Sequence, residues 1–299
     1  MSDPGSPGIR ARRVSRRVAV PLALVMVAVA GAGSAAPPRG DGTGAAPPPA
    51  PAAAAQPTGS PAASPSASPS VPRARRPPAG LPVIEYLLPL PKGFPPDPTP
   101  MSTEQLTEGA RVLTKLAVYD APGGRPRAYL TPEISGVPVT VPIVQRRSGW
   151  VAVLLPSGNR TIGWLPPAGW ATTPLRDQIL VHRKRHKLTW VRDGVAQKSW
   201  TVSIGSDVSP TPLGRTFVLG RGRPTSHVYA GLDVLALGAV PDDPYSVPPA
   251  LRGAHIGIHS WYQNTFGGNS SDGCVQVPKA GQRLLLDEIV PGTQVVVLP

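Results

Sequence analysis

Cysteine is almost absent from this sequence: the 299 residues contain one, Cys274. A single thiol excludes an intramolecular disulfide, so the fold must be stabilised by its hydrophobic cores. Acidic residues are also few, 17 against 30 Lys and Arg, which gives a formal net charge of +13. The basic residues do not alternate with aromatic residues in any stretch, so nucleic-acid binding is not supported. Attraction to anionic cell-envelope polymers is the more natural consequence of this charge.

The apolar run near the N-terminus is short. It covers residues 18–30, whereas a membrane-spanning helix needs about 20 apolar residues. Five arginines precede the run and small residues follow it, which is the pattern of a secretory signal peptide. We therefore interpret residues 1–36 as a signal peptide of an exported, cell-wall protein. An uncleaved N-terminal membrane anchor remains an alternative.

Large apolar side chains are rare in the next segment, residues 37–80, which consists mainly of Pro, Ala and Ser. Such a composition cannot bury enough surface to offset the entropy of ordering, so we expect disorder there. A proline-rich stretch follows, with an apolar patch at residues 83–90 that is suited to lying across a folded domain. We assign residues 37–104 to a disordered linker and an extended segment.

Residues 105–174 have the pattern of a small β domain, and their spacing of strands and turns resembles a bacterial SH3-like domain. Its aromatic residues Tyr119, Trp150 and Trp164 either bind cell-wall material or form the core. We favour the core, because so small a barrel needs its aromatic side chains inside. The expected strands are 116–119, 137–144, 150–155 and 161–165.

Residues 175–299 continue the β pattern, with one late helix. Asp193-Gly194 marks a hairpin turn. Pro278 begins a helix over residues 279–289 whose leucines recur at helical spacing. The expected strands are 179–182, 187–191, 199–204, 216–219 and 294–298.

The chemistry of the chain is concentrated around Cys274 and His259, which are fifteen residues apart. A thiol and an imidazole form a nucleophile and its base when they meet. The run AHIGIHS predicts a strand and GGNSSDG a loop that returns the thiol to that strand. The alternative is a buried cysteine with packed histidines. A metal site is disfavoured, because His255 and His259 on one strand would lie about 13 Å apart.

The segment IGIHS…SSDGCVQVP resembles the L,D-transpeptidase catalytic domain (YkuD family). His259, Ser271, Gly273 and Cys274 match the family motif, whereas Asp272 and Gln276 stand where the family usually has His and Arg or Asn. The upstream segment SIGSDVSPTPLGRTFV is similar to the family's Thr-Pro-x-Gly segment. The resemblance implies a mainly β fold: an L,D-transpeptidase-type β-sandwich with one late helix, preceded by the small SH3-like barrel.

The resemblance also implies an activity. The chain would be a cysteine-dependent L,D-transpeptidase that forms 3–3 peptidoglycan cross-links through a thioester acyl-enzyme. Two alternatives remain: an L,D-carboxypeptidase in which water is the acceptor, and a cell-wall-binding protein that the changes at Asp272 and Gln276 have impaired. No cofactor or metal is implied, the partners are peptidoglycan stem peptides, and the oligomeric state stays open.

The site residues follow from the same resemblance. His259 would activate Cys274, the backbone carbonyl of Ser260 would orient the imidazole, and N–H groups around Gly273 would hold the oxyanion. Residues 227–249 lie where the family has a flap over the groove. The residues expected to bind substrate are Tyr229, Trp261, Ser271 and Gln276.

Overall fold

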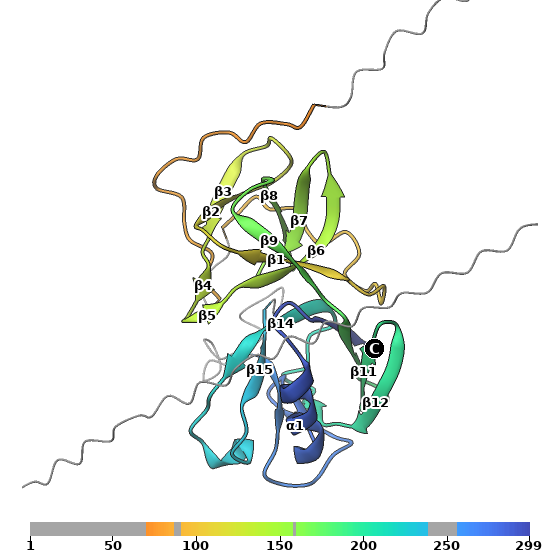
Figure 1. Ribbon diagram of the computed structural model, residues 1–299. Helices are drawn as coiled ribbons and strands as arrows, with labels where there is room; N and C mark the ends of the chain where they lie inside the picture. The colour runs from red at the N-terminus through yellow and green to blue at the C-terminus, as the bar shows by residue number, and fades with distance from the viewer. Residues whose placement is uncertain (1–69, 87–90, 158–159, 239–255) are drawn as a thin grey trace, which may run out of the picture. The chain divides into compact units, whose positions relative to one another are not determined.

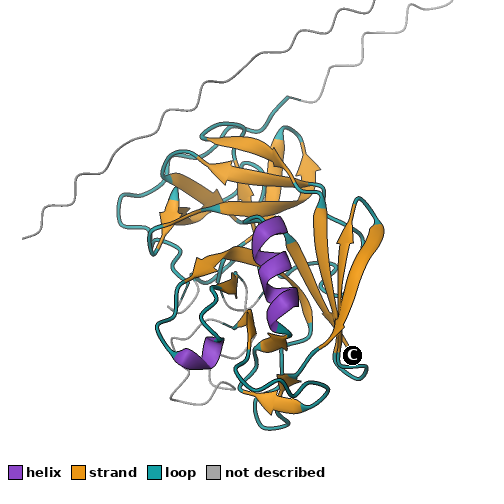
Figure 2. Cartoon of the chain, turned by 60° about the horizontal axis from the view of Figure 1, so that its bottom comes forward, coloured by secondary structure: helices purple, strands orange, loops and turns teal. Residues whose placement is uncertain are grey.

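The computed structural model of this chain describes residues 70–86, 91–157, 160–238 and 256–299. The described residues belong to one compact unit, residues 65–299. The expected signal peptide, residues 37–69 of the expected linker, His255 and residues 239–249 of the expected flap lie outside them. Strands dominate the described residues (Figures 1 and 2), as the sequence predicts.

The first half of the fold is a seven-stranded sheet with the order β3-β2-β8-β7-β6-β1-β9. Apolar and β-branched residues form its strands, and their buried side chains make one core. A short hairpin of β4 (Glu133–Ile134) and β5 (Val137–Pro138) lies beside it. The sheet strands are β1 (Glu108–Val112), β2 (Leu116–Tyr119), β3 (Pro126–Leu130), β6 (Thr140–Arg147), β7 (Trp150–Leu154), β8 (Ile162–Leu165) and β9 (Trp170–Pro174).

Three aromatic residues of this sheet are in the core, as the size of the domain predicts. Tyr119, Trp150 and Trp164 are all buried, and the rings of Tyr119 and Trp150 meet edge to face at 5.0 Å. Their burial leaves little aromatic surface for binding cell-wall material. The resemblance of this sheet to an SH3-like domain stays a prediction.

The proline-rich residues 70–86, called the arm below, cross the first sheet. Tyr119 donates its hydroxyl proton to the Arg75 carbonyl at 2.7 Å, and the Trp150 indole N–H donates to the Pro72 carbonyl at 2.9 Å. Proline-rich backbone offers carbonyls that no internal hydrogen bond uses, so aromatic side chains with polar tips can hold it. The expectation of disorder is therefore wrong for residues 72–80. The segment has no hydrogen-bond donors of its own for these carbonyls, and side chains of the first sheet supply them.

The second half is an eight-stranded sheet with the order β12-β11-β10-β19-β14-β15-β16-β18. The hairpin turn predicted at Asp193-Gly194 is present between β11 and β12, with φ values of 50° and 77°. The strands are β10 (Asp177–His182), β11 (Lys187–Arg192), β12 (Val195–Thr201), β14 (Gly214–Gly222), β15 (Val234–Leu237), β16 (Gly257–Ser260), β18 (Val275–Val277) and β19 (Gln294–Leu298).

Several strands lie outside the sequence expectations, among them β1, β3, β9, β15 and one in the loop before Cys274. β17 (Asn269–Ser271) falls inside the expected loop and pairs in parallel with β13 (Ile204–Gly205). The small polar residues of β17 do not predict a strand by themselves. β17 forms because it pairs with a segment more than sixty residues upstream. The loop that precedes Cys274 is therefore anchored at its middle.

A buried ion pair joins the segment after the arm to the second sheet. Arg215 of β14 donates to both carboxylate oxygens of Asp97, at 2.9 and 2.5 Å, and also to Thr99 at 3.2 Å. Both charged side chains are almost fully buried. Bidentate geometry of this kind fixes orientation, and loss of either partner leaves a buried charge.

The predicted late helix is α1 (Lys279–Glu288), which begins directly after Pro278. Its Gln282 is fully buried, and the side-chain amide donates to the carbonyls of Asp233 at 2.9 Å and Ile258 at 3.0 Å. Gln282 therefore holds β16 next to the position of His259. Among the described residues, no helix is long and apolar enough to cross a membrane.

We predict that Gln282→Leu lowers the free energy of unfolding by about 1–3 kcal/mol, because two buried carbonyls lose their donor. Urea denaturation of the full chain measures this effect. Arg283→Leu is the control, since Arg283 is the next residue of the same helix and is exposed. Equal stability of the two variants would contradict the assigned role of Gln282.

Candidate active site

The site is built on the parallel pairing of β16 with β18. Its register places Ile258 opposite Val275 and His259 opposite Gln276. Successive residues of a strand face opposite sides of the sheet. Ile258 and Val275 belong to the hydrophobic core, so His259 and Gln276 face the other side. Cys274 lies directly before β18, so the loop that carries the thiol returns to the strand of His259.

The imidazole of His259 is held in one tautomer. Its Nδ1 lies 2.7 Å from the backbone oxygen of Ser260, which is the contact expected from the sequence. A carbonyl can only accept, so Nδ1 carries the proton and Nε2 is left as the base. Burial lowers the pKa of His259 below its usual value, and the hydrogen bond to Ser260 partly opposes this. The imidazole is consequently neutral at pH 7.

The thiol of Cys274 is also neutral at rest. Burial raises its pKa, a hydrogen bond with the backbone of Gly257 lowers it, and the charge of Asp272 raises it further. A raised thiol pKa beside a lowered imidazole pKa disfavours a preformed thiolate–imidazolium pair. The arrangement is instead suited to general base catalysis, in which the proton leaves the sulfur as the sulfur attacks.

Ser271 braces the turn that carries the thiol. Its hydroxyl donates to the Cys274 carbonyl at 2.6 Å and accepts the N–H of Gly273 at 3.2 Å. Gly273 has a φ of 108°, a conformation that favours glycine. The N–H of Gly273 is therefore engaged inside the turn, which does not support the expectation that it holds an oxyanion. The geometry supports a conformational role for Gly273 and a bracing role for Ser271.

Gln276 also acts within the loop. Its side-chain oxygen accepts the Ser270 hydroxyl at 3.3 Å, and its backbone exchanges two hydrogen bonds with Ser203, at 2.8 and 3.0 Å. The side chain is 2% exposed. We expected Gln276 to bind substrate, but burial and its contacts indicate that it orders the loop between β17 and β18.

Two aromatic residues that the sequence predicts to bind substrate lie near the imidazole. The ring of Tyr229, in the short helix η1 (His227–Tyr229), meets His259 edge to face at 4.9 Å, and Trp261 lies 6.0 Å away. The hydroxyl of Ser260 donates to the Tyr229 carbonyl at 2.7 Å, which ties η1 to β16. Burial raises the pKa of the Tyr229 phenol, and the charge of Cys274 adds to this. The phenol is therefore protonated at neutral pH.

Sequence reasoning missed Tyr86, at the end of the arm. Burial raises its pKa strongly, a hydrogen bond with the Ile256 backbone opposes this, and the charge of Cys274 raises the pKa further. The phenol is therefore protonated at neutral pH, and it is coupled electrostatically to Cys274 although 188 residues separate them. No local pattern could have shown this, because the position depends on how the arm crosses the fold.

The structure offers no metal-binding group among residues 70–86, 91–157, 160–238 and 256–299: no three His, Cys, Asp or Glu side chains there are placed to share an ion. His182, His186 and His227 lie apart from Cys274 in the sequence and on other elements. The chemistry of the described site is that of one thiol and one imidazole.

Comparisons with known proteins match the second half of the chain to one family model. Residues 176–297 match the L,D-transpeptidase catalytic domain, YkuD. Similar solved structures include an L,D-transpeptidase from Mycobacterium smegmatis (16% identity, 47% of this chain and 74% of that chain, TM-score 0.33) and the catalytic domain of the E. faecium L,D-transpeptidase (21%, 41% and 96%, TM-score 0.30). L,D-transpeptidase 3 from Mycobacterium tuberculosis, in complex with a faropenem-derived adduct, is 16% identical (47% and 74%, TM-score 0.34). A comparison with curated protein sequences gave no match.

We predict that Asp272→Asn lowers the pKa of Cys274, because it removes the negative charge that raises it. The rate of alkylation by iodoacetamide should then rise at neutral pH, and its dependence on pH should move to lower pH. Asp272 is exposed, so solvent screening should keep the increase below about tenfold. Asp287→Asn, an exposed change on α1, serves as the control. Identical pH profiles for Asp272→Asn and the unmodified chain would rule out this coupling.

Proposed function

Because residues 176–297 are a YkuD-type L,D-transpeptidase catalytic domain, we propose that this chain is an exported enzyme that forms 3–3 cross-links between peptidoglycan stem peptides. One observation supports the proposal: β16, which carries His259, pairs with β18, which begins one residue after Cys274, and Nε2 of His259 is left available as the base. The apolar run and arginines of residues 1–36 support export.

The first half-reaction makes the acyl-enzyme. Nε2 of His259 takes the thiol proton while Sγ of Cys274 attacks the carbonyl carbon of the third residue in a stem tetrapeptide. The tetrahedral intermediate collapses, the C–N bond to the terminal D-Ala breaks, and His259 returns the proton to the leaving amine. The product is a thioester between Cys274 and the tripeptide.

The second half-reaction transfers the acyl group. A side-chain amine of another stem attacks the thioester carbonyl and gives its proton to Nε2 of His259. The C–S bond breaks, the sulfur recovers a proton from the imidazolium, and an amide cross-link remains. The neutral resting pair suits both steps, because an imidazole of lowered pKa is unprotonated when each nucleophile arrives.

The aromatic residues around His259 have a binding role in this proposal. The rings of Tyr229 and Trp261 lie near the imidazole of His259. In the sequence, Tyr229 precedes β16 and Trp261 follows it. Their partly buried rings would enclose the acyl chain of the donor stem. The hydroxyl of Ser260 donates a hydrogen bond to the Tyr229 carbonyl. This bond restrains Tyr229 next to the imidazole.

We predict that Cys274→Ala abolishes both cross-linking and covalent reaction with a carbapenem such as imipenem. The reason is that Cys274 is the only thiol of the chain. Intact-protein mass spectrometry after exposure to imipenem measures the adduct, and circular dichroism checks the fold. An adduct on a folded Cys274→Ala protein would refute the assignment of the nucleophile.

We predict that His259→Ala lowers the acylation rate by about 10²–10⁴-fold, the usual range for loss of a general base. His227→Ala is the matched control. That imidazole is exposed and its ring contacts Tyr262 at 5.7 Å rather than the thiol. Equal losses in the two variants, measured by stopped-flow acylation, would show that His259 is not the base.

A further inference from the structure

Aromatic side chains of the first sheet hold the arm at every third residue. Three of them donate to arm carbonyls: Trp150 to Pro72 at 2.9 Å, Tyr119 to Arg75 at 2.7 Å, and Tyr129 to Pro78 at 3.1 Å. Residues 70–78 form neither helix nor strand. A polyproline II helix has three residues per turn and no internal hydrogen bonds, so carbonyls with this spacing lie on one face of it. The spacing therefore indicates that the arm binds in the polyproline II conformation.

The three donors follow one another across the sheet in the order in which they meet the arm. Tyr129 lies on β3, Tyr119 on β2 and Trp150 on β7, and the sheet order is β3-β2-β8-β7. Trp150 and Tyr119 are buried and their rings meet at 5.0 Å, so the core fixes these rings while their polar tips reach the arm. The positions of these two donors are therefore set by the core of the sheet.

Two turns of the sheet bring glycines against the arm. A Cβ placed on Gly149 would lie 3.1 Å from Cγ1 of Val71, and one placed on Gly123 would lie 3.0 Å from Cβ of Pro72. Both glycines have a positive φ, 77° and 67°, a conformation that favours glycine. Nε of Arg75 also donates to the Gly123 carbonyl at 3.0 Å. The sheet therefore meets the arm with closely fitting turns as well as with hydrogen-bond donors.

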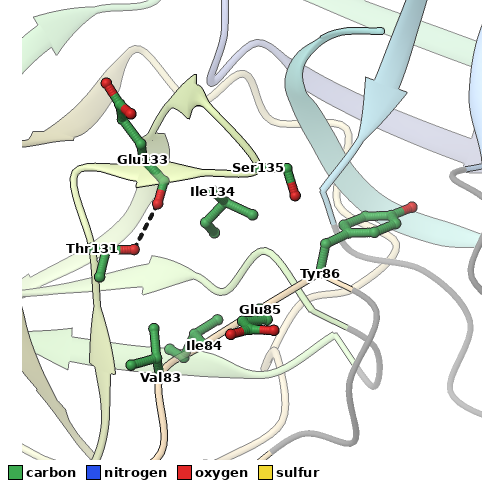
Figure 3. A pocket seen from close by; sticks show the side chains of 8 residues that line it. All are labelled: Val83, Ile84, Glu85, Tyr86, Thr131, Glu133, Ile134 and Ser135. Atoms are coloured by element: carbon green, nitrogen blue, oxygen red, sulfur yellow. Dashed lines mark hydrogen bonds between the residues drawn. The ribbon is translucent and has the colours of Figure 1, made fainter. Parts of the chain in front are cut away.

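The later part of the arm is held through its own backbone. The N–H of Ile84 donates to the Tyr129 carbonyl at 2.7 Å, and the N–H of Tyr129 donates to the Pro82 carbonyl at 2.8 Å. These bonds add residues 82–84 to the edge of β3. Figure 3 shows residues 83–86 beside a hollow of about 310 Å³ that Thr131 and the β4–β5 hairpin also line. The end of the arm is thus fixed by contacts separate from the row of aromatic donors.

We propose that this face of the first sheet is a recognition surface for proline-rich chain in the polyproline II conformation, and that residues 71–78 of this chain are its occupant. We call it the arm-binding face; it is formed by Tyr119, Tyr129, Trp150, Gly123 and Gly149. The inference does not rest on the proposed transpeptidase activity. Its consequence is that the first sheet anchors the Pro/Ala/Ser-rich linker and does not offer this face to cell-wall material.

Recognition by the arm-binding face depends on conformation more than on side chains. Bonds to carbonyls accept any residue at those positions, whereas proline restricts φ to about −65° and so lowers the entropy lost on binding. Pro72 and Pro77 are half-buried, whereas Arg73 and Arg76 are exposed. The matching partner is therefore a proline-rich segment with accepting carbonyls three residues apart, and the side chains of Arg73 and Arg76 are dispensable.

The test measures how fast trypsin cleaves the full chain after Arg73, an exposed residue within the occupant. Mass spectrometry of quenched samples gives the rate, and a synthetic peptide of residues 69–80 gives the rate for the free segment. Cleavage of the full chain should be slower by about tenfold or more, because the protease cuts the released arm. It should also be complete before cleavage begins after Arg215, which is buried, since the arm leaves a folded sheet.

Removal of single hydroxyl groups tests the row of donors. Tyr119→Phe and Tyr129→Phe keep the ring, and each should raise the rate after Arg73 by about two- to tenfold, the range for one lost hydrogen bond. Tyr262→Phe is the matched control and should leave the rate unchanged, because that hydroxyl accepts the side-chain amide of Gln263 at 2.9 Å instead.

A change in the arm itself tests the conformation. Pro77→Gly should raise the rate after Arg73, because glycine enlarges the set of conformations open to the released arm. Ala79→Gly makes a similar change one residue beyond the last carbonyl of the row, at Pro78. It should leave the rate close to that of the unmodified chain.

A peptide added in trans tests recognition without the covalent connection. It has the sequence of residues 69–80 with glutamine in place of the three arginines, so trypsin does not cut it. At a millimolar concentration, comparable to the effective concentration of a tethered segment, it should displace the arm and raise the rate after Arg73 by about twofold or more. A second peptide with glycine also in place of the four prolines should have no effect.

Four results would overturn the inference. The first is an equal rate in the full chain and in the free segment. The second is an unchanged rate in both Tyr119→Phe and Tyr129→Phe, or an equal change in Tyr262→Phe. The third is equal competition by the two peptides. The fourth is release of the arm by soluble peptidoglycan fragments but not by the proline-rich peptide, which would make the face a cell-wall-binding surface. None of these readouts depends on enzymatic activity.

Discussion

The parallel pairing of β16 with β18 is the constraint on which the site depends. One residue of slippage would turn His259 toward the core and Ile258 toward the thiol, because side chains alternate along a strand. The apolar pattern prevents this slippage, since Ile258, Val275 and Val277 are all fully buried. Gln282 adds a second restraint by binding the Ile258 carbonyl. The same hydrophobic burial that stabilises the sheet thus aligns His259 with the segment that carries Cys274, the proposed base and nucleophile.

Burial also sets the protonation states of the pair. It raises the pKa of Cys274 and lowers that of His259, so the resting enzyme holds a neutral thiol and a neutral imidazole. A neutral thiol is less reactive toward stray electrophiles and oxidants than a thiolate. Reactivity then requires a carbonyl placed within reach of both groups. Substrate positioning, the role proposed for Tyr229 and Trp261, would then be a central part of catalysis.

Short segments of the sequence predict much of this arrangement. The strand of His259, the late helix, the Asp193-Gly194 hairpin and the contact of Ser260 with His259 all follow from short patterns or from the resemblance. The features that sequence reasoning missed are non-local. β17 pairs with a distant strand, and Gln276 is buried against Ser203. Tyr86 belongs to the apolar patch that the sequence places across a folded domain, but its position in the core could not be predicted from that patch. Such contacts depend on the packed fold, which supplies partners that no short segment contains.

The central claim is that Cys274 carries the acyl group of a stem peptide. It is tested most directly by incubating the full chain with stem tetrapeptide in the absence of an acceptor, then quenching in acid, digesting and mapping the modified peptide by mass spectrometry. The account predicts a tripeptide thioester on Cys274, with release of one D-Ala for each enzyme acylated. Release of D-Ala with Cys274 left unmodified, or an acyl group on any other residue, would contradict it.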